Sequence, residues 1–314
     1  GGMQVGDLSS FVTYVTQILS SLMMVTMMFM MSSRAMASAR RISEVLDELP
    51  DISDEGAAQP ELRVEHGDVE FRDVSFRYYK GSSAEVLSHI NLHIKAGSTV
   101  GIIGSTGSGK SSLINLVPRF YDATQGEVLV DGVNVRDYKL KALRDKIGYV
   151  PQQSFLFKGT IASNVAYGDT DRDDDTVRRA CDVAQATEFI DKKQKKYDSG
   201  ISQGGSNVSG GQKQRLSIAR AVYRHPEILI FDDSFSALDF KTDRAVRDAL
   251  EKEAKDSTKL IVAQRIGTIM NADRIIVLDD GKVVGQGTHE ELLDTCEVYR
   301  QIAESQLSED ELKR

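Results

Sequence analysis

A glycine-rich run carries the residues of this chain that are best suited to bind an anion: Gly104, Ser105, Thr106, Gly107, Ser108, Gly109, Lys110 and Ser111. Glycine lets successive backbone N–H groups turn toward one oxyanion, and the lysine adds a full positive charge. The run follows the apolar segment 99–103 and precedes the helical segment 112–117, the strand–loop–helix context that a phosphate-binding loop requires. We therefore expect Lys110 to contact the outer phosphates of a nucleotide and the Ser111 hydroxyl to ligate Mg²⁺.

A second chemical group follows the apolar run 228–231, where Asp232 ends a predicted buried strand. Its carboxylate can hold the hydration shell of Mg²⁺. Because the carboxyl ends of parallel strands meet at one edge of a sheet, we expect Asp232 to lie beside the glycine-rich loop. This pair alone predicts a P-loop NTPase, a class that contains motors, kinases and transporters.

Short β-like runs alternate with helical patterns from about residue 61 onward. The predicted strands are 71–78, 90–94, 99–103, 128–130, 147–150, 228–231, 260–262 and 274–278. Their alternation with helices favours an α/β fold with a largely parallel central sheet and an antiparallel portion near its start. Residues 155–223 show helical patterns and no convincing strand, so we expect a helical subdomain inserted between strands of the sheet.

Turn and cap signals mark the ends of several of these elements. The pairs Asp131-Gly132 and Asp280-Gly281 predict tight β-hairpins. Thr288, followed three residues later by Glu291, predicts a capping box at the start of a closing helix.

The first fifty residues differ from the rest in composition. No charged residue occurs between Leu8 and Ser33, and residues 11–31 are long enough to cross about 30 Å of hydrocarbon as a helix. A signal peptide is disfavoured because Asp7 stands where a basic region belongs, the apolar run is too long and no cleavage site follows. Arginines after the run place the following domain in the cytoplasm by the positive-inside tendency: Arg34, Arg40 and Arg41.

Polar residues recur at helical spacing within this predicted membrane span: Thr13, Thr16, Gln17, Ser20 and Ser21. They form one stripe on a helix rich in Met and Leu, and such a stripe should not face lipid. It either packs against neighbouring helices or lines a water-filled substrate cavity. Because one helix cannot enclose a pathway, we expect other membrane helices to accompany it.

The bulk composition excludes some partners. The chain has 40% apolar and 27% charged residues, which is ordinary for a globular protein, but its net charge is −8. A phosphate-backbone binder needs clustered Lys and Arg, so nucleic acid is not an expected partner. Cys181 and Cys296 lack metal-site spacing and are interpreted as buried thiols in a reducing compartment.

A further motif narrows the class of protein: Val208, Ser209, Gly210, Gly211 and Gln212. This run, followed by Lys213-Gln214-Arg215-Leu216 and placed about twenty residues before Asp232, closely resembles the signature sequence of ABC transporters. At a helix N-terminus, Ser209 and the glycine amides would present donors and a dipole to the γ-phosphate of an ATP held by another subunit. The resemblance covers residues 61–303.

Other positions resemble the family motif by motif. Tyr78 fits the aromatic residue that stacks on adenine, Ser112 belongs to the ATP-binding run, and Gln152 fits the loop glutamine that links Mg²⁺ to the membrane domain. The loop expected to cross the dimer interface comprises Ser236, Ala237, Leu238 and Asp239. The resemblance implies ATP and Mg²⁺ as cofactors, with Ser111, Gln152 and Asp232 around the metal.

The resemblance also implies the organisation of the chain. Residues 1–48 would be the last transmembrane helix and its cytoplasmic extension, 49–60 a linker, and 61–314 a P-loop NTPase nucleotide-binding domain of the ABC type. A helix leading directly into this domain is similar to the exporter branch, in which membrane and nucleotide domains are fused. The expected location is the cell membrane, with a second half-transporter, the lipid bilayer and an unidentified exported substrate as partners.

Two positions depart from the active family pattern. Asp233 stands where the general base is usually Glu; its side chain is one methylene shorter, and a displacement of about 1 Å can cost ~10²-fold in rate. Gln264 stands where the switch histidine is expected, and a glutamine cannot carry charge or relay a proton. The segment Gln203-Gly204-Gly205 is also atypical, since the family often has an acidic and a basic residue there.

The two departures resemble the degenerate subunit of heterodimeric ABC exporters. In such a pair this chain would bind ATP but cleave it poorly, and its signature would complete the active site of the partner. Two alternatives remain open: a non-hydrolysing nucleotide-binding regulator and a homodimeric exporter with slow chemistry. A soluble ABC ATPase of DNA repair or translation is opposed by the uncharged span and the acidic charge balance.

Overall fold

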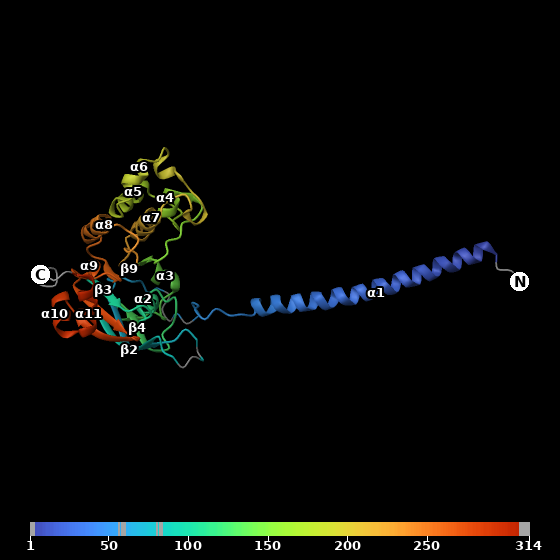
Figure 1. Cartoon of the computed structure of the whole chain (residues 1–314), viewed down its shortest axis with the longest axis horizontal. Coiled ribbons are helices and arrows are strands. Elements are labelled where there is room, and N and C mark those ends of the chain that lie inside the picture. The colour runs from blue at the N-terminus through green and yellow to red at the C-terminus, as the bar shows by residue number, and fades with distance from the viewer. Residues whose placement is uncertain (1–3, 56, 58–60, 80, 82–83, 308–314) are drawn as a thin grey trace. The chain divides into compact units, whose positions relative to one another are not determined.

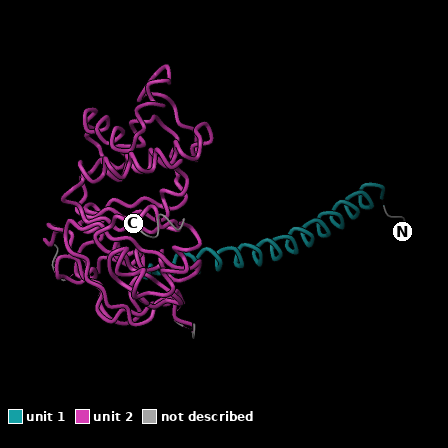
Figure 2. Tube along the Cα trace, turned by 60° about the vertical axis from the view of Figure 1, so that its left-hand side comes forward, with its two compact units in different colours: residues 1–51 teal, residues 52–314 magenta. Residues whose placement is uncertain are grey.

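The computed structural model describes residues 4–55, 57, 61–79, 81 and 84–307. The chain divides into two compact units, Gly1–Asp51 and Ile52–Arg314 (Figure 2). The first unit consists of one helix, and the second contains the sheets and the remaining helices.

Helix α1, Val5–Leu46, has 42 residues and is long and apolar enough to cross a membrane. At 1.5 Å per residue it measures about 60 Å, roughly twice the thickness of the hydrocarbon layer. The hydroxyl of Thr13 donates to Ser9 O, that of Thr16 to Val12 O, and that of Thr26 to Leu22 O. Thr13 and Thr16, the threonines of the predicted polar stripe, therefore satisfy their hydroxyl donors within the helix itself, as does Thr26 outside the stripe.

The second unit is built on a six-stranded sheet in the order β12-β11-β3-β10-β9-β6. The strands β11, β3, β10, β9 and β6 are parallel to their neighbours, and β12 pairs antiparallel with β11. Their bounds are Lys282–Gly287 (β12), Arg274–Asp279 (β11), Thr99–Gly104 (β3), Thr258–Val262 (β10), Ile228–Asp232 (β9) and Ile147–Val150 (β6). The predicted mostly parallel central sheet is confirmed.

A second, antiparallel sheet has the order β2-β1-β4-β5. Its strands are Leu87–Ile94 (β2), Val69–Phe76 (β1), Gln125–Val130 (β4) and Val133–Asn134 (β5). The predicted antiparallel portion is confirmed, but β1 ends two residues earlier than expected, so Tyr78 lies outside the strand.

Alternating side chains of the central sheet pack into two separate hydrophobic clusters. Ile228 and Ile230 of β9 belong to the cluster shared with the antiparallel sheet and α2, Lys110–Leu116. Leu229 and Phe231 belong to the cluster shared with the helices of the other face. Since both faces are covered, β9 and β10 are buried along their whole length, as expected for a central parallel sheet.

The helices of the inserted segment gather at one end of the unit, away from β2 and β4 (Figure 1). They are α4 (Ile161–Val165), α5 (Asp174–Val183), α6 (Thr187–Asp191) and α7 (Gly210–Tyr223), with short 3₁₀ turns at Lys196–Asp198 and Gln203–Gly205. The prediction that this segment contains no strand is wrong, because β7 (Gly159–Thr160) pairs with β8 (Gly200–Ile201). Strands of two residues are too short to leave a periodic pattern in the sequence.

The remaining helices are α3 (Leu140–Arg144), α8 (Phe240–Glu253), α9 (Ile266–Ile269), α10 (His289–Thr295) and α11 (Glu297–Gln306). The capping box at the start of α10 is confirmed, with the Thr288 hydroxyl accepting from Glu291 N. Both predicted hairpins form, and the residues at their turns have positive φ: Asp131, Gly132, Asp280 and Gly281. Cys181 and Cys296 are buried free thiols.

Candidate nucleotide-binding site

The glycine-rich loop connects β3 to α2, as the sequence predicts. A side chain at Gly104 would place its Cβ 2.0 Å from Leu278 O, so only glycine fits at the end of β3, where the loop begins. Gly109 has φ 96° and is the N-cap of α2, a conformation that glycine adopts without strain. The backbone of this loop is therefore shaped by two positions that exclude any side chain.

The Lys110 ammonium group lies folded back into this loop. Its Nζ donates to Ser105 O at 2.7 Å and to Gly104 O at 2.9 Å. Burial lowers the pKa of Lys110, and the nearby carboxylates of Asp233 and Asp232 oppose that shift. A cation surrounded by backbone groups at the start of a helix is suited to bind phosphate oxygens.

Oxygen ligands for a divalent cation meet beside the loop. The Ser111 hydroxyl donates to Asp232 Oδ1 at 2.8 Å, although the two residues are 121 positions apart in the chain. A hydroxyl and a carboxylate are hard oxygen ligands of the kind that Mg²⁺ prefers, and few protein ligands suffice when phosphate oxygens supply the rest. Among the described residues no group of three His, Cys, Asp or Glu side chains could hold a metal.

Asp233 lies next to this pair in a tightly constrained position. It is 7% exposed and has φ 47°, an uncommon conformation for a residue other than glycine. Its Oδ2 accepts from Gln264 Nε2 at 2.6 Å and from Gln152 Nε2 at 3.2 Å. The structure therefore brings together both departures from the family pattern and the predicted loop glutamine.

The charge state of Asp233 reflects competing effects. Burial raises the pKa of its carboxyl, and the neighbouring Asp232 acts in the same direction. The hydrogen bonds from Gln152 and Gln264 and the charge of Lys110 lower it, but they do not cancel the effect of burial. The carboxyl thus binds its proton more tightly than an exposed aspartate does.

The loop that carries Gln264 is attached to the C-terminal helix. Gln306, the last residue of α11, donates from Nε2 to Gln264 O at 2.8 Å and accepts from Ile266 N at 2.9 Å. Sequence reasoning missed Gln306, because no local pattern shows which loop the end of α11 will contact.

A second residue that sequence reasoning missed is Tyr149 of β6. Its hydroxyl lies 2.9 Å from Asn115 Oδ1 and 3.3 Å from Asp232 Oδ2. The only sequence signal was its place in a predicted strand that precedes Gln152.

Tyr78 lies in an aromatic cluster at the start of α2. Its ring centroid is 4.8 Å from that of Phe76 and 5.1 Å from that of Tyr121. Its hydroxyl lies 2.8 Å from Ser112 Oγ, which places it next to the phosphate-binding loop. Tyr78 is 44% exposed, so part of its surface is open to a ligand.

The signature motif begins helix α7. Ser209 is the N-cap, its hydroxyl accepts from Gln212 N, and the Gln212 side chain accepts from Ser209 N in a reciprocal capping box. Gly210 and Gly211 start the helix, so their N–H groups belong to the unpaired first turn. Among the described residues no hydrogen bond joins this motif to the phosphate-binding loop.

The predicted interface loop lies between the site and α8. The Ser236 hydroxyl donates to Asp233 O at 2.8 Å, Leu238 is buried, and Asp239 caps α8 by accepting from Thr242 N at 3.0 Å. A Cβ at Gly211 would be 3.5 Å from Ala237 O, so this loop also lies against the signature.

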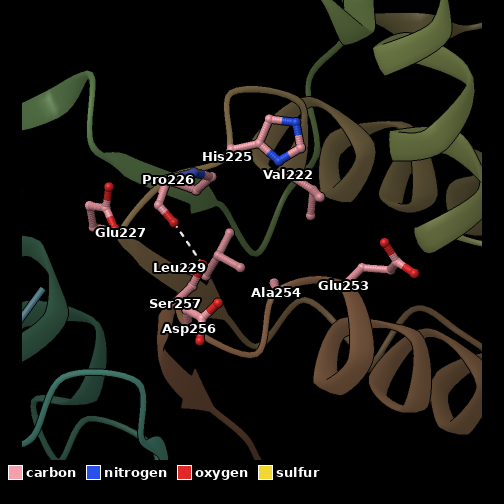
Figure 3. Close-up of a pocket in the computed structure, with 9 residues that line it drawn as sticks. All are labelled: Val222, His225, Pro226, Glu227, Leu229, Glu253, Ala254, Asp256 and Ser257. Carbon is pink, nitrogen blue, oxygen red and sulfur yellow. Dashed lines mark hydrogen bonds between the residues drawn. The ribbon is translucent and has the colours of Figure 1, made fainter. Parts of the chain in front are cut away.

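A cavity of about 200 Å³ lies at the opposite, amino ends of β9 and β10 (Figure 3). It is lined by residues that precede these strands, among them His225, Glu227 and Ser257, whereas Asp232 ends β9. This cavity is therefore separate from the phosphate-binding loop.

The central sheet, the glycine-rich loop between β3 and α2, and the Ser111–Asp232 pair at the carboxyl ends of the strands define a P-loop NTPase domain. Residues 87–236 match the family described as ABC transporter. The chain therefore contains an ABC transporter domain, and its fold class is the ABC type of nucleotide-binding domain preceded by an apolar helix.

Several relatives extend this match to nearly the whole chain. An uncharacterized ABC transporter ATP-binding protein of Mycobacterium tuberculosis is 44% identical over 309 residues, covering 98% of this chain and 53% of the relative. The uncharacterized ABC transporter ATP-binding protein YfiB of Bacillus subtilis is 42% identical over 306 residues, with 98% and 52% coverage. An ATP-dependent lipid A-core flippase of Haemophilus influenzae is 42% identical over 274 residues, with 87% and 46% coverage.

A solved structure shows the same arrangement of elements. A bacterial Atm1-family ABC exporter with ATP bound has a TM-score of 0.84 and 34% identity, and the match covers 98% of this chain and 54% of that one. The chain thus spans about half the length of the relatives that it matches.

Proposed function

We propose that this chain is the ATP-binding part of an ABC exporter subunit, in which ATP binding and hydrolysis between two nucleotide-binding domains drive export across a membrane. The observation that carries the proposal is the Ser111–Asp232 contact of 2.8 Å beside the glycine-rich loop. Residues 1–48 would supply the last membrane helix and its extension, 49–60 a linker and 61–314 the cytoplasmic nucleotide-binding domain.

Each group at the site has a proposed task in binding. Tyr78 stacks on the adenine, the loop amides and Lys110 hold the phosphates, and Ser111, Asp232 and Gln152 hold the bound cation in place. Mg²⁺, when bound, neutralises developing negative charge on the phosphate oxygens. The exposed face of Tyr78 and its position beside Ser112 support the adenine assignment.

The same site is proposed to be weak in cleavage. Asp233 has a shorter side chain than the usual glutamate, and two glutamine amides already occupy its Oδ2. A base that must polarise water needs its carboxylate free and within hydrogen-bond distance of that water. Gln264 can donate a hydrogen bond to a phosphate but cannot exchange a proton.

The nearly intact signature suggests where the productive chemistry takes place. Ser209 and the first-turn amides of α7 would complete the ATP site of a second half-transporter, while the interface loop 236–239 crosses between the subunits. Because the base and switch positions of this chain are altered while its signature is nearly intact, we favour a heterodimer with a competent partner. A slow homodimer and a non-hydrolysing regulatory subunit are the competing assignments.

Single-turnover hydrolysis by the 314-residue chain, purified in detergent, tests this assignment. We expect the native chain to bind ATP and cleave it slowly, and the double variant Asp233→Glu/Gln264→His to cleave it ~10²-fold faster. Adding Lys110→Ala to the double variant is the matched control, since it should abolish the gain if cleavage occurs at this site. Brisk cleavage by the native chain would favour a homodimer and contradict the heterodimer assignment.

A further inference from the structure

Tyr149 and Asp232 lie on the same face of two neighbouring strands. β6 and β9 are parallel, with Tyr149 opposite Ile230, so Asp232 is two residues further along β9. Successive side chains alternate between faces, which puts Ile230 and Asp232 on one side, and a long side chain reaches such a diagonal neighbour. The strand register therefore directs the Tyr149 hydroxyl to Asp232 Oδ2, 3.3 Å away.

The Tyr149 ring is held from the side. Its centroid is 5.3 Å from that of Phe120 in an edge-on arrangement. The Arg144 guanidinium in turn lies over the Phe120 ring, 5.4 Å from its centroid. Arg144 is fixed in turn by donating to Pro118 O and Arg119 O. A ring packed in this way has little freedom to withdraw its hydroxyl from the carboxylate.

The Tyr149 hydroxyl can act only as a proton donor to Asp232. An ionised carboxylate can only accept, so the hydrogen in this contact comes from the phenol. The hydroxyl lies 2.9 Å from Asn115 Oδ1 and 3.3 Å from Asp232 Oδ2, so its one proton faces two acceptors, of which the charged carboxylate is the stronger partner.

The two oxygens of Asp232 thus have separate donors. Ser111 donates to Oδ1 and Tyr149 to Oδ2. A serine hydroxyl that ligates Mg²⁺ must turn its oxygen to the metal, and its proton can then no longer be relied on to orient the carboxylate. Of these two donors to the Asp232 carboxylate, Tyr149 is the one that is not also expected to ligate Mg²⁺.

We propose that Tyr149 is a positioning residue for the magnesium site: it fixes Asp232 through Oδ2 and so aims Oδ1 at the cation beside Ser111. This inference rests on the proposed function only in that Mg²⁺ and a nucleotide bind at this loop.

The test is the Mg²⁺ dependence of nucleotide binding by the full 314-residue chain carrying Tyr149→Phe, followed with a fluorescent ATP analogue. The variant keeps the ring that packs on Phe120 and loses only the hydroxyl. We expect about 10- to 100-fold more Mg²⁺ at half-saturation, the range for losing one hydrogen bond to a charged group, and unchanged binding in EDTA. A purely structural role would weaken binding equally with and without Mg²⁺.

Tyr138→Phe is the matched control. Tyr138 is also buried, and its hydroxyl donates to Val130 O at 3.0 Å, away from Asp232. It should leave the Mg²⁺ dependence as in the native chain. A Tyr149→Phe variant with native Mg²⁺ dependence would overturn this inference while leaving the proposed function intact, and a native chain that binds no nucleotide would overturn both.

Discussion

The phosphate-binding loop and the Asp233–Gln264 pair lie at the same edge of the central sheet but differ in how far they follow the family pattern. The loop after β3 keeps every residue that the pattern requires for holding phosphates. The ends of β9 and β10 keep Asp232, but Asp233 and Gln264 stand where the family pattern has the base and the switch. In the proposed function, binding and cleavage therefore depend on separable sets of residues, and only the set proposed for cleavage departs from the family pattern.

The physical basis of the two regions also differs. Phosphate binding uses backbone amides and a fixed charge, which depend on loop shape and on glycines such as Gly104 and Gly109. Cleavage depends on the length and the protonation of single side chains, so a change of one methylene group matters. An aspartate at 233 and a glutamine at 264, in place of the glutamate and histidine of the family pattern, can thus weaken cleavage while the loop remains unchanged.

The largest expected effect is on ATP binding by the phosphate-binding loop. Lys110→Ala should lower the affinity for ATP by at least ~100-fold, because the variant removes the one side-chain cation that lies within the loop. Titration with a fluorescent ATP analogue measures it, and the exposed Lys252→Ala of α8 is the control for loss of a lysine charge. An affinity within threefold of the native value would show that phosphate binding does not depend on this loop.

A smaller effect is expected at the signature. Ser209→Ala removes the N-cap of α7, which should cost about 1 kcal/mol and lower Tm by roughly 2–4 °C. ATP binding by the isolated chain should stay native, since the signature is assigned to the nucleotide of a partner. Thr288→Ala removes the equivalent capping box of α10 and should give a similar loss in Tm.

Calorimetry and nucleotide titration on the same samples separate the two roles. Weaker ATP binding by Ser209→Ala, with Thr288→Ala unaffected, would place the signature at this chain's own nucleotide and contradict the assignment.

The smallest expected effect concerns the protonation of Asp233. In the folded chain the pKa of Asp233 is raised above 3.8, the ordinary value that applies to the unfolded chain. Between the unfolded and the folded pKa, the folded chain therefore holds a proton that the unfolded chain has released. The native chain therefore loses stability as pH rises through this interval, and Asp233→Asn does not. Relative to the native chain, the variant should gain about 1–3 °C in Tm between pH 4 and pH 7.

Thermal unfolding at pH 4, 5, 6 and 7 gives this difference directly. Asp239→Asn provides a contrast, because hydrogen bonds from Thr242 lower the pKa of Asp239 and its variant should lose stability toward neutral pH. Parallel behaviour of the two variants would mean that burial does not govern Asp233.

Much of the fold could be predicted from the sequence. The parallel strands of the central sheet are apolar runs, because each is covered on both faces, and this makes them visible without a structure. The edge strand β12 alternates exposed and partly buried residues and includes glycines, so it left only the hairpin signal that precedes it. The two-residue strands β7 and β8 left no signal at all.

The sequence by itself determined the chemistry that is local in the chain: the phosphate-binding loop, the capped start of the signature helix, and the altered residues at 233 and 264. Their identity and backbone context are written in short contiguous segments. Only the tertiary structure decided which side chains meet. Strand order puts Tyr149 beside Asp232, and the docking of α11 puts Gln306 on the loop of Gln264, because both contacts depend on packing between segments far apart in sequence.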